Sequence, residues 1–212
     1  MIPDWATERR RMAQVQLRRR GIRDERVLAA MSEIPREEFV PADSRVEAYI
    51  DGPIHVGHGQ TISQPYMVAL MAQLLSLTGE ETVLEVGAGC GYAAAVLGQV
   101  AARVVAVELI PALVQLARDN LRRTGRDGNV TVVQGDGRFG YPALAPYRGI
   151  SVAAAAAEIP TALLDQLDDP GCLVIPVDVT EDQELRTVWK RAGRIEYRVA
   201  ALCRFVPLRG GR

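Results

Sequence analysis

The fold of this chain is decided by one stretch, Val83-Leu84-Glu85-Val86-Gly87-Ala88-Gly89-Cys90-Gly91-Tyr92. Its first part is a largely apolar run typical of a buried strand, and glycine then occupies every second position. Because glycine has no Cβ, such a loop lets backbone N–H groups approach a ligand that side chains would block. The stretch therefore predicts a strand, a glycine-rich turn and a helix, with a ligand at the turn.

A second apolar run, residues 104–107, ends at Glu108, roughly 20 residues beyond the first glycine. At that distance in a doubly wound fold, an acidic side chain accepts hydrogen bonds from the ribose hydroxyls of a cofactor. A glycine-rich turn without a ligand, or a solvated carboxylate at a strand end, would explain either feature alone. Together they predict a site for a nucleoside cofactor.

The glycine spacing separates two such cofactors. A dinucleotide fingerprint reads G-x-G-x-x-G, whereas this chain reads G-x-G-x-G and has Tyr92 where the third glycine would stand. A pyrophosphate needs the helix N-terminus close by, but S-adenosylmethionine has no phosphate and needs only room for its amino-acid end and its sulfonium. The pattern favours S-adenosylmethionine, with an NAD oxidoreductase as an alternative.

The composition indicates a globular chain without a dominant charge. Of 212 residues, 48% are hydrophobic, and 25 Lys and Arg stand against 26 Asp and Glu, for a net charge of -1. This suits a single domain over residues 1–212 and gives no general attraction to nucleic acid or to membranes. The basic residues 9–11 and 18–20 are expected on the wet face of an amphipathic helix.

Cysteine and histidine are scarce. The three cysteines, Cys90, Cys172 and Cys203, argue against a disulfide framework and fit a reducing compartment. Cys90 is expected to be a small filler in the glycine loop. His55 and His58 are too few for a histidine-rich metal site or a histidine-based triad, so no metal is expected. Without a signal peptide or a membrane-spanning apolar run, we expect a cytoplasmic protein.

Periodicity gives the order of the elements. The first part predicts helices over 8–19 and 24–31 separated by Gly21, with Asp24 as an N-cap, then an ordered loop over 49–64 and a helix starting at Pro65. After residue 79, strands and helices alternate, which predicts a parallel sheet covered by helices on both faces. The strands are expected at 82–86, 104–107, 130–134, 150–154 and 172–176, and the helices at 92–100, 111–123 and 161–167.

The end of the chain departs from this alternation. Segments 184–191 and 194–204 flank Ala192-Gly193 and mix polar with apolar residues, which predicts an antiparallel hairpin at the sheet edge. The expected fold is therefore α/β: a mostly parallel, doubly wound, Rossmann-like sheet with a C-terminal antiparallel hairpin. Ligands bind such sheets at the carboxyl ends of the strands, where the glycine loop, Glu108 and Asp136-Gly137 would meet. Asp136 could accept a bond from an adenine amino group, or could form an ordinary Asp-Gly turn.

The segment from Gly57 to Tyr66 is dense in small polar residues just ahead of a helix, and Ser63 could help satisfy free N–H groups at that helix start. The same segment is the most specific part of a resemblance, for the chain resembles the protein-L-isoaspartate O-methyltransferases. The likeness extends over nearly the whole chain and includes Pro35-Arg36-Glu37-Glu38-Phe39-Val40-Pro41, Gly135-Asp136-Gly137, Glu158-Ile159-Pro160 and Arg204-Phe205-Val206-Pro207-Leu208.

The resemblance implies a Rossmann-like S-adenosylmethionine-dependent methyltransferase fold. It implies an enzyme that transfers a methyl group to the free α-carboxylate of L-isoaspartyl residues in damaged proteins and peptides, starting repair through a succinimide. By similarity, residues 1–78 supply N-terminal helices and an acceptor loop, 79–177 the cofactor-binding core and 178–212 the hairpin. We expect a monomer, since nothing in the sequence identifies a protein partner.

The resemblance also assigns site residues. Ser63 is expected in catalysis. The expected cofactor-binding residues are Thr61, Gly87, Ala88, Gly89, Gly91, Glu108, Leu109, Asp136 and Gly137, and those on the substrate side are His58, Gln60, Val152, Ala153 and Val206. An ionised carboxylate is already a nucleophile, so alignment and desolvation supply most of the acceleration and no strong base is needed.

Three departures from the family pattern concern the acceptor side. Tyr147-Arg148-Gly149 stands where an aspartate is common, residues 152–157 lack the usual hydroxyl and proline, and Ala93 replaces a frequent glutamine. They are consistent with neutral drift, since alanine conserves a small volume. They also leave open a related carboxylate methyltransferase with a dedicated peptide or small-molecule acceptor, or a silent S-adenosylmethionine-binding protein, although the intact segment 57–66 argues against a pure binder.

Overall fold

The computed structural model describes residues 3–210. The chain begins with one continuous helical run that ends at Gly21, whose φ of 100° lies in the left-handed region where glycine is favoured. This run starts at Trp5, three residues before the predicted residue 8. It comprises an α-helix, a π-helical turn and a 3₁₀ turn: α1 (Trp5–Arg11), η1 (Met12–Leu17) and η2 (Arg18–Arg20).

The second helix, α2 (Glu25–Glu33), confirms the predicted N-cap. The Asp24 carboxylate accepts hydrogen bonds from the N–H groups of Arg26 and Val27, which no residue of the helix can satisfy. Two 3₁₀ turns follow, at η3 (Arg36–Glu38) and η4 (Ala42–Glu47), where prolines interrupt the helical pattern.

Where an ordered loop was predicted, the chain forms a small antiparallel hairpin of β1 (Ile54–Gly57) and β2 (Gln60–Ile62). Its turn holds His58 at a φ of 54° between two glycines that also have positive φ. These strands are too short to show a period of two in the sequence. The next helix, α3 (Pro65–Leu74), begins at Pro65 as predicted.

The main sheet has the strand order β5-β4-β3-β6-β7-β8-β9 within residues 3–210. Neighbours from β5 to β7 are parallel, and β7–β8 and β8–β9 are antiparallel, which confirms the predicted fold class. The strands are β3 (Thr82–Val86), β4 (Arg103–Glu108), β5 (Val130–Gln134), β6 (Tyr147–Val152), β7 (Leu167–Val179), β8 (Asp182–Arg191) and β9 (Arg194–Cys203). β7 extends beyond the predicted residue 176 because it pairs with β8 from Gly171 to Val179.

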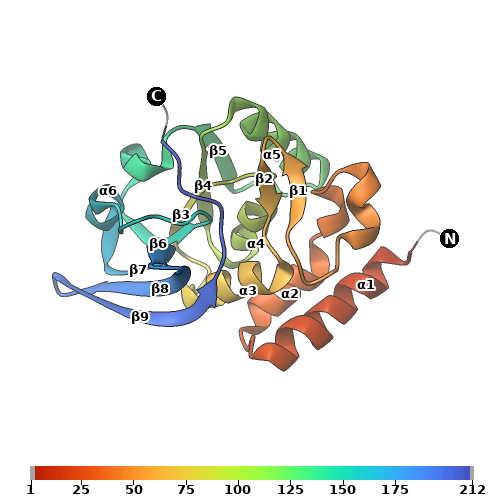
Figure 1. Ribbon diagram of the computed structural model, residues 1–212, viewed down its shortest axis with the longest axis horizontal. Helices are drawn as coiled ribbons and strands as arrows, with labels where there is room; N and C mark the ends of the chain where they lie inside the picture. The colour runs from red at the N-terminus through yellow and green to blue at the C-terminus, as the bar shows by residue number, and fades with distance from the viewer. Residues whose placement is uncertain (1–2, 211–212) are drawn as a thin grey trace.

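Helices cover the two faces unequally (Figure 1). On one face α3, α4 (Tyr92–Val100), α5 (Pro111–Arg123) and the N-terminal helices build the larger apolar cluster. The other face carries a smaller cluster under the short helix α6 (Thr161–Asp165) and the turns η5 (Gly137–Phe139) and η6 (Pro142–Leu144). No helix in the described part of the chain is long and apolar enough to cross a membrane.

The strand order places a switch point beside β3. The chain runs from β3 through β4 to β5 at one edge of the sheet, then returns to form β6 on the other side of β3. At such a point the connections leave in opposite directions and open a crevice at the carboxyl ends of the strands. The glycine loop follows β3, so the fold places it at this crevice.

Candidate active site

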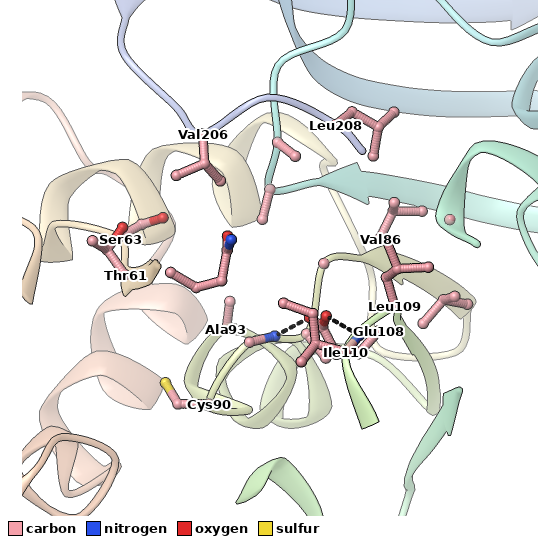
Figure 2. Close-up of a pocket in the computed structure, with 18 of the residues that line it drawn as sticks. Thr61, Ser63, Val86, Cys90, Ala93, Glu108, Leu109, Ile110, Val206 and Leu208 are labelled. Carbon is pink, nitrogen blue, oxygen red and sulfur yellow. Dashed lines mark hydrogen bonds between the residues drawn. The ribbon is translucent and has the colours of Figure 1, made fainter. Parts of the chain in front are cut away.

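A cavity of about 290 Å³ lies at the carboxyl ends of β3, β4 and β6. Figure 2 shows Thr61 and Ser63 at one end of it and Glu108, Leu109 and Ile110 towards the other, with Val206 and Leu208 from the C-terminal segment on a further side. Four separate parts of the chain supply its wall: residues 60–63, the loop 86–93, the end of β4, and residues 206–210. The rest of the lining is Val68, Gly137, Ala153 and Ala154.

The glycine loop owes its glycines to backbone conformation. Gly87, Gly89 and Gly91 have φ values of 89°, 55° and 88°, which L side chains rarely adopt. The N–H groups of Gly87 and Ala88 donate to the Val107 carbonyl, and that of Gly91 donates to Ala88. The expectation that these groups face a ligand is therefore wrong, and they form no anion-binding nest for a pyrophosphate.

Glu108 ends β4 with only 7% of its surface exposed. Its two carboxylate oxygens accept hydrogen bonds from the N–H groups of Gly89 and Ile110, both at 2.9 Å (Figure 2). A carboxylate has about four lone-pair directions, so about two remain for hydroxyl donors in the cavity. The carboxylate is thus fixed in place by backbone and suited to a ribose.

Thr61 and Ser63 form the opposite end, just beyond the hairpin β1–β2. Helix α3 has Gln64 as its N-cap residue and no side-chain capping bond. Ser63 therefore does not perform the capping role that its position ahead of a helix allowed. Within residues 3–210 its hydroxyl makes no hydrogen bond to protein, so it is available to a substrate.

The C-terminal segment closes the cavity by pairing with the alanine-rich stretch after β6. The Ala155 N–H donates to Val206 at 2.8 Å, and the Leu208 N–H donates to the Ala155 carbonyl at 2.7 Å. Small side chains at 153–156 allow this close backbone approach. Leu208, Arg209 and Gly210 also line the cavity. No local pattern in the sequence predicts this, and only the family likeness over 204–208 points to the segment.

A buried carboxyl group lies near Ser63. Glu85 is 1% exposed and its Oε2 has no hydrogen-bond partner among the described residues. Burial, and secondarily the charge of Glu108, raise the pKa of Glu85 well above its usual range. With Ser63 and Ser151 it lines a side cavity of about 20 Å³, which has room for about one water. Sequence reasoning treated Glu85 only as part of a strand.

Two buried polar side chains, those of Asn120 and Arg36, contact the glycine loop or the start of α4 from the protein interior. Asn120, 4% exposed, donates from Nδ2 to the Cys90 carbonyl at 2.9 Å. Burial raises the pKa of the Cys90 thiol to about 11, so it stays protonated at neutral pH and suits a filler better than a nucleophile. The Arg36 guanidinium, fully buried, lies over the Tyr92 ring at 4.9 Å.

Eleven expected site residues line the cavity, and four lie outside its wall. Gly91 begins α4 and packs against Ala117, His58 lies exposed at the hairpin turn, and Val152 is buried in the sheet core. Asp136 caps η5 and pairs with Arg138, accepting from its backbone N–H at 3.0 Å and its guanidinium at 2.7 Å. The eleven in the wall are Gln60, Thr61, Ser63, Gly87, Ala88, Gly89, Glu108, Leu109, Gly137, Ala153 and Val206.

The doubly wound sheet, the inward-bonded glycine loop and the buried Glu108 define the class of Rossmann-like S-adenosylmethionine-dependent methyltransferases. Within that class, the chain belongs to the family described as protein-L-isoaspartate(D-aspartate) O-methyltransferase, whose sequence model matches residues 8–212.

Curated relatives and a solved structure agree with this assignment. Protein-L-isoaspartate O-methyltransferases of Methanoregula boonei and Methanoculleus marisnigri are 50% and 51% identical to it, over 96% of this chain and 93% and 92% of theirs. A candidate protein-L-isoaspartate O-methyltransferase from Plasmodium falciparum, solved with S-adenosyl-L-homocysteine, aligns with a TM-score of 0.82 at 26% identity. That alignment covers 95% of this chain and 98% of the other.

Proposed function

We propose that this protein transfers the methyl group of S-adenosylmethionine to the free α-carboxylate of L-isoaspartyl residues in damaged proteins and peptides, which initiates repair through a succinimide. The observation that carries the proposal is the position of the family-specific segment 60–63, which lies in one cavity wall opposite Glu108. A general nucleoside-binding site would have no need for this segment.

At the cofactor end, Glu108 would hold the ribose, with Gly87, Ala88, Gly89 and Leu109 around it. S-adenosylmethionine supplies an electrophilic methyl group on a sulfonium. The glycine loop fits it because the N–H groups that would bind a phosphate are already used within the protein. Gly91 and Asp136 support the site from behind, by starting α4 and capping η5.

At the acceptor end, the Ser63 hydroxyl would donate a hydrogen bond to the substrate carboxylate and hold it in line. Ala93, Ala153 and Val206 give this end small apolar walls that exclude water. Glu85, kept neutral by its raised pKa, places no second negative charge next to the substrate carboxylate. Alignment and desolvation are sufficient here, since the nucleophile is already ionised.

The test is methyl transfer from labelled S-adenosylmethionine to two peptides that differ only in L-isoaspartate or aspartate at one position. Transfer confined to the isoaspartyl peptide is expected. Ser63→Ala should lower kcat/KM by about 10–100-fold, the value of a hydrogen bond to a charged group, and leave the Kd of S-adenosylhomocysteine unchanged. A collapse of cofactor affinity in Ser63→Ala would place Ser63 in the cofactor site instead.

A specialised acceptor is the second candidate, favoured by one observation. The wall formed by Ala93 and Ala153 is apolar, and Ala93 stands where the resemblance leads us to expect a glutamine. If neither peptide is methylated while S-adenosylhomocysteine still binds, a dedicated peptide or small-molecule acceptor, or a silent binder, replaces the repair function. A cytoplasmic location remains part of the proposal, supported by three free cysteines.

A further inference from the structure

Strand β9 forms an uncovered edge of the sheet (Figure 1). Within residues 3–210 it is the last strand and pairs only with β8. An edge of this length presents a row of unpaired N–H and C=O groups, and proteins commonly shorten, bulge, charge or cover such edges. Here the pairing is regular from Arg194 to Val199, and a bulge at Ala200 interrupts it only near the end.

The edge also carries an apolar stripe. Four of the eight large hydrophobic side chains exposed among the described residues belong to β9: Ile195, Tyr197, Val199 and Leu202, with 45%, 59%, 41% and 67% of their surfaces exposed. Their partners in β8 are Lys190, Val188, Arg186 and Glu184, which alternate along one face of the sheet. The four apolar side chains therefore lie on a single face, continuous with the α6 side of the core, to which Val188 belongs.

The opposite face of the same strand carries alternating charges. Arg194, Glu196 and Arg198 follow one another at every second position. In the described part of the chain none of the three forms an ion pair. Such a pattern is self-complementary, because an antiparallel copy of the strand can place each carboxylate opposite a guanidinium.

We propose that β9 pairs antiparallel with β9 of a second copy of this chain, on a two-fold axis at Tyr197, and joins the two sheets. In this register Glu196 lies opposite Arg198 of the partner subunit, and the contact occurs twice. On the other face Ile195 lies opposite Val199 of the partner subunit, and the two Tyr197 rings meet at the axis. Both apolar and charged cross-strand pairs of this kind stabilise a sheet.

Neighbouring registers are unfavourable. Moving the axis to Glu196 places two glutamates opposite each other, and moving it to Arg198 does the same with two arginines, which destabilises the pairing. An axis at Ile195 leaves too little strand on one side, and one at Val199 runs into the bulge at Ala200. The sequence of β9 therefore favours one arrangement, and the proposed dimer differs from the monomer expected from the sequence.

The dimer leaves the catalytic cavity open, because no residue of β9 lines it. Sedimentation equilibrium of the full chain should show a mass that rises with concentration from 23.1 kDa towards twice that value. Glu196→Arg and Arg198→Glu each place like charges opposite one another and should each weaken the dimer by about tenfold. Val46→Lys, at an exposed apolar position outside β9, should leave it unchanged.

The decisive experiment combines the two charge reversals in one chain. The double variant Glu196→Arg/Arg198→Glu restores both pairs and should dimerise as the original chain does, and the two single variants should form a heterodimer when mixed. A constant mass of 23.1 kDa at all concentrations would overturn the proposal. So would dimers whose dissociation constant is the same in the single charge-reversal variants as in the original chain. Methyl transfer should be equal in all variants, so failure of the dimer and failure of the proposed function are distinguishable.

Discussion

The two ends of the cavity are built in different ways. At the cofactor end, the polar atoms are fixed by nearby backbone: Glu108 accepts from Gly89 and Ile110, and the loop N–H groups bond to Val107 and Ala88. At the acceptor end, Ser63 has no protein partner among the described residues, and Glu85 has an unpaired oxygen. One end is complete without a ligand, whereas the other leaves polar groups for a substrate or water to satisfy.

Under the proposed function, this difference assigns affinity for the cofactor to one end of the cavity and choice of the acceptor to the other. In the proposed function, the preorganised Glu108 end would bind the cofactor without rearranging hydrogen bonds, whichever acceptor is present. The acceptor end is assembled from three segments far apart in the sequence: the hairpin β1–β2, the alanine-rich stretch after β6, and the C-terminal residues. In the proposed function, changes in any of these segments are expected to alter the choice of acceptor while the Glu108 end stays intact.

The largest expected effect is at Glu108. If its carboxylate bound no ligand, the contrast between the two ends of the cavity would no longer hold. Glu108→Ala should weaken binding of S-adenosylhomocysteine by roughly 1.5–3 kcal/mol, or about 10–150-fold, because hydrogen bonds to a charged group are lost. Isothermal titration calorimetry measures the change. Glu80→Ala, the same deletion at an exposed position, should leave the Kd as it was, and an unaltered Kd in Glu108→Ala would remove Glu108 from the site.

The second effect concerns Glu85, which lies near Ser63 at the side cavity. Its pKa is raised in the folded protein, so the native state keeps a proton that the unfolded chain releases above its ordinary pKa of 4.5. Stability from this group is therefore present below pH 4.5 and is lost as the pH rises towards the folded pKa, by about 1.4 kcal/mol for each pH unit. The Glu85→Gln side chain cannot ionise, so the variant does not lose this stability. Its free energy of unfolding should therefore exceed that of the original chain by a growing amount as the pH rises above 4.5.

Urea unfolding of the apoprotein between pH 5 and 7 tests this, and Glu81 provides a control of opposite sign. Burial favours its neutral form, but hydrogen bonds from Thr78 and Gly79 outweigh burial and lower the pKa of Glu81. Its contribution is present above pH 4.5 and is lost as the pH falls. Glu81→Gln should thus destabilise the protein at neutral pH. Parallel stability curves for Glu85→Gln and the original chain would show that Glu85 ionises freely.

Most of the cofactor end could be predicted from the sequence because its determinants are local. A strand, three glycines and an acidic residue at the next strand end specify the β3–α4 turn and the place of Glu108 without knowledge of distant segments. The Asp24 cap and the Ala192-Gly193 turn are local in the same way, and both central turn residues have the positive φ that this hairpin type needs.

The features that could not be predicted from the sequence depend on long-range packing. The strands β1 and β2 are too short for a periodic signal, and their hairpin forms where α3 and the sheet provide a surface. The unpaired Oε2 of Glu85 follows from which side chains surround it, not from its neighbours in the chain. Asp136 illustrates the limit: its place at a strand end could be predicted from the sequence, but the hydrogen bonds that Arg138 donates to its carboxylate could not.

The smallest effect tests how far the rigidity of the cofactor end depends on support from behind. Asn120→Ala deletes the hydrogen bond to the Cys90 carbonyl and leaves that carbonyl unpaired, which should lower stability by about 1–2 kcal/mol. The Kd for S-adenosylhomocysteine should rise by about 5-fold or less, because Glu108 and the loop N–H bonds remain. Asp119→Ala, the exposed neighbour on α5, is the matched control. An affinity loss as large as that of Glu108→Ala would mean that the loop is held by Asn120, and that the cofactor end is less complete in itself than its local hydrogen bonds indicate.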